Sequence, residues 1–345
     1  MAEVLRYVNT ASTAGGDGTT NATAGANRAY ATLSEWEANE GTDLVTDGDT
    51  HRVICSGGAD STAVTLNGFT VDATHFATIE GEYDGAAGAL DTGLYHLTTT
   101  SATQIQCDCD YTVFDKLQFD GSGTANQSIL FSTAKNDGTV KNSVFYDLAR
   151  YAVFQSTGAT NVTHYNWLAY KLGRSPIGVS TTSTGMGEVY NCTAYDYNST
   201  DQVNGSFIEQ DANNQFKVVN CIGIASASST RADFEQTYTL ATGSDYNASS
   251  DTSAPGANSI HSITASTEFV SVTGGSEDFH LAFGSTLLTD GVGPSSDASV
   301  PTTDIDGDTR SGTTCDIGFD EYVAAGGGGN GYSVINSIYN RLLAG

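Results

Sequence analysis

The sequence predicts an all-β protein built as a parallel β-helix, in which the chain coils and each coil stacks on the one before. Short runs rich in β-branched and aromatic residues alternate with Gly, Asn and Asp from about residue 50 onward. No long helical pattern separates them, so a fold of alternating strands and helices is not expected. A valine followed two places later by a polar residue recurs at Val140, Val162, Val189 and Val218, at intervals of 22, 27 and 29 residues. Irregular strand-and-turn repeats of this length are typical of stacked coils.

Residues 26–40 (ANRAYATLSEWEANE) form the one stretch before the C-terminus that predicts a helix. Tyr30, Leu33 and Trp36 recur at the spacing of a single helix face. A loop rich in Gly, Thr and Asn precedes the stretch, and the short strand runs begin after it. We therefore expect one short helix at the N-terminal end of the coil.

The repeat also predicts a register between neighbouring coils. Aligning the two V-x-N-C stretches places Asn191 on Asn220 and Cys192 on Cys221. Stacked asparagines at a bend can hydrogen-bond side chain to side chain along the axis, as amide ladders do in stacked sheets. Cysteine at the next position would serve as a small, inward-facing apolar residue. The alternative is that two such matches arise by chance in a chain rich in Val and Asn.

The C-terminal 14 residues differ in composition from the acidic, threonine-rich body. They follow a Gly-rich stretch and carry apolar residues at helical spacing. This stripe could pack on the chain's own coil, dock as a helix into a groove of a partner, or add a strand to a partner's sheet edge. The reach of the Gly-rich stretch favours a partner. The candidate partner-binding residues are Tyr332, Val334, Ile335, Ile338, Tyr339, Leu342 and Leu343.

Both ends of the body resemble a known family. YVNTASTAGGDGTTNATAGANRAYATLSEWEA (7–38) resembles the N-terminal cap of right-handed parallel β-helix proteins of the pectin-lyase-like superfamily. EDFHLAFGSTLLTDGVG and DIDGDTRSGTTCDIGFDEY, within 277–322, resemble that family's closing rungs. The chain departs from the pattern at Thr286, where proline is usual, and at Phe319, where alanine is usual. The resemblance implies a right-handed, single-stranded parallel β-helix with a short N-terminal capping helix and a C-terminal linker plus tail.

The same resemblance sets the expected organisation of the chain. Residues 1–45 would form the N-terminal cap and residues 46–322 the parallel β-helix body with its closing rungs. Residues 323–331 would be a Gly-rich linker, and residues 332–345 a C-terminal anchoring tail. Because the body closes on its own motif, the tail is surplus to the fold.

For function, the resemblance implies several classes, because the superfamily includes polysaccharide lyases and hydrolases, adhesins, and phage spikes and fibres. The N-terminus MAEVLRYVNT lacks the apolar run of a signal peptide. Together with the Gly-linked tail, this favours a bacteriophage virion protein, made in the host cytoplasm and attached to capsid or tail proteins as a head-decoration protein, spike or fibre. A homotrimer is expected, as is common among spikes of the resembled family. The alternatives are a tailspike-type depolymerase and a non-catalytic adhesin, each binding a host-surface glycan.

Charge and cysteine usage exclude other classes. The net charge is −27, from 13 Lys and Arg against 40 Asp and Glu. Nucleic acids and anionic membranes would repel such a chain, and no stretch is long and apolar enough for membrane insertion. The six cysteines follow neither a zinc-finger pattern nor a disulfide framework, so we expect free, buried thiols.

Two carboxylate pairs are the candidate catalytic residues of the enzyme alternative. Glu209 with Asp211, and Asp233 with Glu235, have the i, i+2 spacing that puts two side chains on one face of a strand, about 6.5–7 Å apart. Glycosidases need two carboxyl groups roughly 5–10 Å apart. With 40 acidic residues such pairs also arise by chance, and the sequence favours a protein that is not an enzyme.

A run of alternating carboxylates is the candidate metal site. Asp304, Asp306 and Asp308 in DIDGDTR could wrap a calcium ion. The EF-hand pattern fails, because Gly307 occupies loop position 4 and Cys315 position 12. Aspartates that bond the backbone amides of their own loop explain the motif without a metal. The six histidines are dispersed and form no zinc motif, so no cofactor is assigned.

Overall fold

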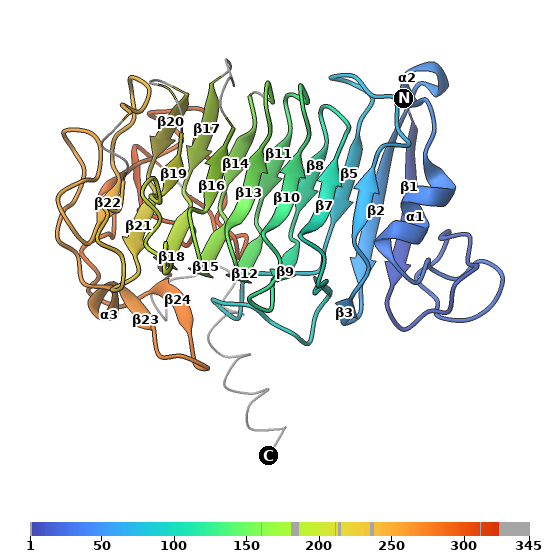
Figure 1. Cartoon of the computed structure of the whole chain (residues 1–345), viewed down its shortest axis with the longest axis horizontal. Coiled ribbons are helices and arrows are strands. Elements are labelled where there is room, and N and C mark those ends of the chain that lie inside the picture. Colours follow the sequence, from blue (N-terminus) through green and yellow to red (C-terminus); the bar gives the residue numbers. More distant parts are fainter. Residues whose placement is uncertain are drawn as a thin grey trace.

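The chain forms a parallel β-solenoid of about seven turns, seen side-on in Figure 1. This computed structural model describes residues 2–159, 161–180, 186–210, 212, 215–234, 238–310 and 312–323. Most turns of the coil add one strand to each of three parallel sheets, so neighbouring strands in space are about one turn apart in sequence. This arrangement confirms the predicted all-β parallel coil.

Three sheets make up the described part of the coil. The first sheet contains, in spatial order, β1 (Ala2–Asn9), β2 (Asp49–Ser56), β5 (Ala77–Glu80), β8 (Val113–Asp115), β11 (Thr139–Lys141), β14 (Thr163–Tyr165), β17 (Gly187–Tyr190) and β20 (Phe216–Val219). The second contains β4 (Val64–Leu66), β7 (Thr103–Cys107), β10 (Gln127–Phe131), β13 (Tyr151–Gln155), β16 (Ile177–Val179) and β19 (Ile208–Glu209). The third contains β3 (Ala59–Asp60), β6 (His96–Leu97), β9 (Gln118–Asp120), β12 (Val144–Leu148), β15 (Leu168–Leu172), β18 (Thr193–Tyr197), β21 (Ile222–Ala225) and β22 (Ala248–Ser249).

The core runs along the inside of the coil as stacks of like side chains. Because side chains alternate along a strand, each strand sends every second residue inward. Phe119 and Phe145 stack with ring centroids 5.0 Å apart, and Trp167 meets the edge of Phe145 on the next turn. All three side chains are fully buried. Their burial on successive turns holds the strands in register.

The predicted stacking of Asn191 and Asn220 is confirmed. The Asn220 side-chain amide donates to Asn191 Oδ1 at 3.4 Å, and both side chains are fully buried. The flanking strand register also aligns Cys192 with Cys221. All six cysteines are free and buried, as predicted.

The predicted alignment of Val162 is wrong by two residues. His164, and not Val162, faces both Val140 and Val189. The next bend explains the shift, because the Asn166 amide donates to Asn142 Oδ1 at 3.2 Å across an interval of 24 residues. Both bend asparagines adopt the left-handed conformation that asparagine tolerates, with φ of +46° and +49°. The bends therefore set the register, and a histidine occupies an inward position of a valine stack.

The helix α1 (Leu33–Glu40) begins later than the predicted 26–40. Thr32 ends the preceding extended segment and its hydroxyl oxygen accepts from the Glu35 amide at 3.1 Å, which is a helix N-cap. Tyr30 instead pairs with the outer edge of β1, where its backbone bonds Tyr7 and Asn9 at 2.9 and 2.8 Å. A second short helix, α2 (Leu44–Asp47), follows. Within the described ranges, no helix has the length and apolar character needed to cross a membrane.

The segment after β22 does not continue the coil as the predicted closing rungs. Ile260 bridges the edge of β22, α3 (Ala265–Glu268) follows, and the chain then runs back outside the third sheet. Its strands pair antiparallel: β23 (Phe269–Ser271) with β24 (Asp278–Leu281), and β25 (Gly291–Val292) with β26 (Thr314–Cys315). Figure 1 shows β23 and β24 outside the stack of coil strands. We call residues 250–323 the C-terminal segment.

The aromatic outer face of the third sheet explains why this segment folds back. Tyr146, Tyr170 and Tyr195 align across β12, β15 and β18 on the outside of the coil. Phe279 packs on Tyr170 and Tyr195, with ring centroids 5.0 and 5.3 Å away, and is fully buried. Covering this apolar row removes it from water, which favours a lateral position over further rungs. Of the predicted linker and tail, residues 323–345, all but Val323 lie outside the described residues.

Candidate functional site

A hollow of about 690 Å³ lies where the C-terminal segment meets the loop 81–95 between β5 and β6. Carboxylates dominate its lining, which includes Glu277, Asp278, Asp306, Asp308, Asp320 and Glu321. Among the described residues that line it, His280 is the only basic side chain. This concentration of acidic groups around one imidazole makes the hollow the candidate functional site.

Strand β24 places His280 in the hollow through simple alternation. Phe279 and Leu281 point toward the third sheet and are buried, so Asp278 and His280 point the other way. The Phe279 amide donates to the Gly88 carbonyl oxygen at 2.8 Å, which fixes β24 against the loop 81–95. The Leu281 amide donates to Asp320 Oδ2 at 2.8 Å and draws that carboxylate to the same place.

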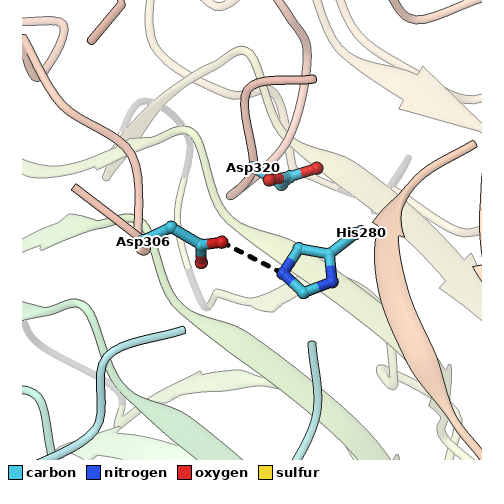
Figure 2. A group of neighbouring side chains, drawn as sticks. All are labelled: His280, Asp306 and Asp320. Carbon is cyan, nitrogen blue, oxygen red and sulfur yellow. Dashed lines mark hydrogen bonds and ion pairs between the residues drawn. The ribbon is translucent and has the colours of Figure 1, made fainter. Parts of the chain in front are cut away.

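His280 is held between carboxylates from three parts of the segment (Figure 2). Its Nδ1 lies 2.6 Å from Asp278 Oδ1, and its Nε2 lies 3.2 Å from Asp306 Oδ2. One ligand atom each from His280, Asp306 and Asp320 lie within 4.8 Å of one another. Burial lowers the pKa of His280, but its hydrogen bonds to Asp278 and Asp306 and the charges of Asp320 and Asp306 outweigh it. The net pKa of His280 is therefore well above its ordinary value.

Asp304 organises the loop that presents Asp306. Its Oδ1 accepts from the amides of Asp306 and Asp308 at 3.0 and 2.8 Å, and its Oδ2 accepts from the Glu321 amide at 2.8 Å. Burial raises the pKa of Asp304 to about 8. The explanation in which an aspartate bonds its own loop's amides is thus confirmed for Asp304. Calcium binding by Asp304, Asp306 and Asp308 stays a prediction.

Asp306, from that loop, and Asp320, from the stretch after β26, both line the hollow. The Asp306 side chain is only 8% exposed, and its Oδ1 is buried with no hydrogen-bond partner among the residues that the structure describes. Asp320 is 5% exposed, and burial is the largest cause that raises its pKa to about 6. Two glycines with positive φ, Gly85 and Gly88, allow the close approach, since a Cβ at either would clash with Asp306, Asp278 or His280.

The carboxylates predicted as catalytic lie elsewhere, on the coil. Glu209 in β19 forms an ion pair with Arg174 and accepts from the Tyr151 hydroxyl at 3.1 Å. Asp233 accepts from the amides of Ala225 and Ser250 at 2.7 and 2.6 Å. Burial is the largest cause that raises the pKa of both carboxyl groups. Both side chains thus have partners that hold coil segments together.

The second member of each predicted pair, Asp211 and Glu235, lies outside the described residues, as does every residue of the predicted partner-binding set from Tyr332 to Leu343. Their assignments stay predictions. The sequence reasoning missed His280 and Asp320. The signal that could have found His280 is the alternation in DFHL, which puts Asp278 and His280 on one face of a strand.

The fold places the chain in the class of parallel β-solenoid proteins. No family model matches the chain, and no curated protein matches it. Among solved structures, it is similar to the crystal structure of pectate lyase Pel9A, with a TM-score of 0.35 and 12% sequence identity over 92% of this chain and 96% of that chain.

Proposed function

We propose that this chain is a structural component of a bacteriophage particle, a solenoid rod attached through residues 332–345. The observation that carries the proposal is that, within the described residues, the folded body is hydrogen-bonded up to Tyr322. The Glu321 amide donates to Asp304 Oδ2 at 2.8 Å and the Tyr322 amide to Asp316 Oδ2 at 2.7 Å. The Gly-rich stretch and the apolar C-terminal sequence follow directly.

An apolar stripe joined to the body by a Gly-rich sequence suits docking into a partner's groove. We propose a capsid or tail protein as that partner, with the chain acting as a head-decoration protein, spike or fibre and assembling as a homotrimer. The body is suited to this role, because continuous side-chain stacks brace the coil. Its net charge of −27 opposes non-specific association between the many copies that a particle carries.

The test compares binding of full-length chain and of residues 1–322 to particles stripped of this protein. Full-length chain should rebind and residues 1–322 should stay in the supernatant, while both keep the same circular dichroism. Within the tail, Ile338→Asp should abolish rebinding because it puts a charge in the apolar stripe. Ser337→Asp adds the same charge outside the stripe and should leave rebinding unchanged. Equal rebinding of residues 1–322 would overturn the proposal.

A second candidate function, binding or cleavage of a host-surface glycan, is favoured by the surroundings of Glu209. Burial raises the pKa of its carboxyl, as a general acid requires, and Tyr151 lies within hydrogen-bond distance. Incubation with a panel of bacterial polysaccharides should then release product, and Glu209→Gln should release none. Binding without product would indicate an adhesin, and neither binding nor product would count against both forms.

A further inference from the structure

We propose that His280, Asp306 and Asp320 bind one divalent transition-metal ion of the zinc or manganese class. This inference does not depend on the proposed attachment to a particle. It rests on the orientation of the imidazole, the spacing of the ligand atoms and the unpaired oxygen of Asp306.

The imidazole is oriented as in a metal site. An ionised carboxylate only accepts hydrogen bonds, so the 2.6 Å contact to Asp278 places a proton on Nδ1 of His280. The 3.2 Å contact to Asp306 places a second proton on Nε2 when no metal is bound, and a metal ion would displace that proton. Nε2 points toward Asp306, and Asp320 lies beside the same ring (Figure 2). A carboxylate that accepts from one ring nitrogen while the other faces the ion is the usual support of a metal-binding histidine.

The ligand atoms have the spacing that a small ion requires. Two ligands, each about 2.0–2.1 Å from a tetrahedral ion, lie about 3.3 Å apart. His280 Nε2 and Asp306 Oδ2 are 3.2 Å apart. The Asp320 ligand atom lies within 4.8 Å of the other two, so a small side-chain rotation completes the set. The Leu281 amide donates to Oδ2 of this carboxylate at 2.8 Å and limits the extent of that rotation.

Charge and burial at the site also point to a bound cation. Four aspartates, Asp278, Asp306, Asp308 and Asp320, share the hollow with one imidazole. The Asp306 side chain is 8% exposed, and its buried Oδ1 has no hydrogen-bond partner in the described ranges. His280 pairs with the other oxygen, Oδ2, but a buried polar atom without a partner such as Oδ1 is costly, and a bound metal ion near the carboxylate would offset that cost. The nitrogen ligand favours zinc, the two carboxylates also suit manganese, and calcium takes only oxygen ligands.

The ion would join parts of the chain that are distant in sequence. His280 comes from β24, Asp306 from the loop braced by Asp304, and Asp320 from the stretch that follows β26. Binding would therefore hold β24, the loop with Asp306 and the stretch with Asp320 together, beside the loop 81–95. Because the ion binds the folded chain, it should raise the melting temperature.

The experiment titrates the full-length, chelator-treated chain with Zn²⁺ and, separately, with Mn²⁺ by calorimetry. The six free thiols are soft ligands that suit Zn²⁺ but not Mn²⁺. The Mn²⁺ titration therefore tests the proposed site without binding by cysteine. The expected result is one ion per chain and a melting temperature several degrees higher with the ion than with chelator. An imidazolium shared between carboxylates, with no metal, predicts no binding and no change in melting temperature, and that result would overturn the proposal.

Variants locate the ion. His280→Gln and Asp320→Asn should each remove this one ion. His75→Gln is the matched control, because His75 makes a similar ring contact to Asp72 at 3.0 Å outside the hollow. Asp278→Asn should keep the stoichiometry but weaken affinity about 10–100-fold, and it gives an answer even where His280→Gln does not fold. Binding to His280→Gln and Asp278→Asn as tight as to the unaltered chain would also overturn the proposal.

Discussion

Asn220 is fully buried, adopts a φ of +56° and connects the coil to the C-terminal segment. Its amide donates to the Val292 carbonyl oxygen at 2.8 Å, and its Oδ1 accepts from the Val292 amide at 2.9 Å. The same side chain also bonds Asn191 on the previous turn. One residue thus supports the bend, the ladder and the attachment of β25.

We predict that Asn220→Ala and Asn220→Gly both lower the free energy of unfolding by at least about 2–3 kcal/mol, because both leave buried groups of Val292 without partners. Alanine should cost about 1 kcal/mol more than glycine, since it disfavours positive φ. Urea unfolding measures both values. Asn161 is the control, with a φ of +56° and an exposed contact to Asp137 at 3.1 Å. At Asn161, alanine should still lower the free energy of unfolding by about 1 kcal/mol more than glycine. The loss of about 2–3 kcal/mol that both substitutions cause at Asn220 should be absent.

The buried side chain of His164 makes the free energy of unfolding depend on pH. Burial lowers its pKa to about 3, against about 6.5 in an unfolded chain. The unfolded state therefore binds more protons between these values, and the contribution of His164 to stability falls as pH drops through this window. Gln at this position keeps an acceptor for the Trp167 indole, which donates to His164 Nδ1 at 3.3 Å.

We predict that the free energy of unfolding of the unaltered chain falls by about 2 kcal/mol more than that of His164→Gln between pH 6 and pH 4. Chemical denaturation at several pH values measures this difference. His261→Gln makes the same change at an exposed histidine and should follow the unaltered chain. Parallel curves for the unaltered chain and His164→Gln would show that His164 does not titrate in this way.

At the scale of elements, the C-terminal segment is attached to the coil mainly through the outer face of the third sheet. Phe279 packs on Tyr170 and Tyr195, and the Tyr170 hydroxyl accepts from the Leu90 amide at 3.0 Å. Loop 81–95, β24 and β15 therefore meet at one point. The candidate site lies on the other face of β24, so its geometry depends on this packing.

We predict that Phe279→Ala increases hydrogen exchange across residues 269–322 and leaves the first sheet protected, because it removes a fully buried ring from this junction alone. The expected loss is about 3–5 kcal/mol for that ring. Phe283 lies in the same segment, but its side chain is 89% exposed. Phe283→Ala should leave exchange unchanged. A uniform increase across the whole coil would instead mean that segment and coil unfold together.

The coil could be predicted from sequence because its interactions repeat. A strand, a bend and an inward side chain recur on each turn, so the match of Asn191 with Asn220 was enough to set one register. The alignment of Val162 is wrong because Val162 fits the pattern of a valine followed two places later by a polar residue, while the inward position is taken by His164, whose ring accepts from the Trp167 indole. The course of the C-terminal segment could not be predicted, since its strands pair antiparallel and follow no repeat, even though the tyrosines that it covers recur on successive turns.

The candidate site was only partly visible in sequence for the same reason. Asp306 belongs to a run of aspartates that attracts notice. His280 and Asp320 are separated from it in sequence, and only the fold-back of β24 and the bonding of Asp320 to Leu281 bring them together. A site assembled from three separate parts of a chain leaves no spacing motif.

At the scale of the whole molecule, charge repulsion opposes compactness. Forty acidic side chains face 13 basic ones, and described ion pairs such as Arg52–Glu80 offset only part of the excess. We predict that raising NaCl from about 0.01 M to about 0.5 M increases the melting temperature by a few degrees, because salt screens the repulsion. Differential scanning calorimetry measures it, with residues 1–322 as the control for the tail. A fall in melting temperature would show that ion pairs outweigh repulsion.

The edges of the outermost strands decide how long such a rod can become. A stack of parallel strands exposes amides and carbonyls at each end, and an uncovered end is a template for another chain. Here Tyr7 and Asn9 of β1 donate to the carbonyl oxygens of Gly18 and Tyr30 at 2.8 Å, and Ser249 of β22 donates to that of Ile260 at 3.1 Å. These backbone bonds cover part of each outer edge, and at those residues the chain opposes the addition of a strand from another copy.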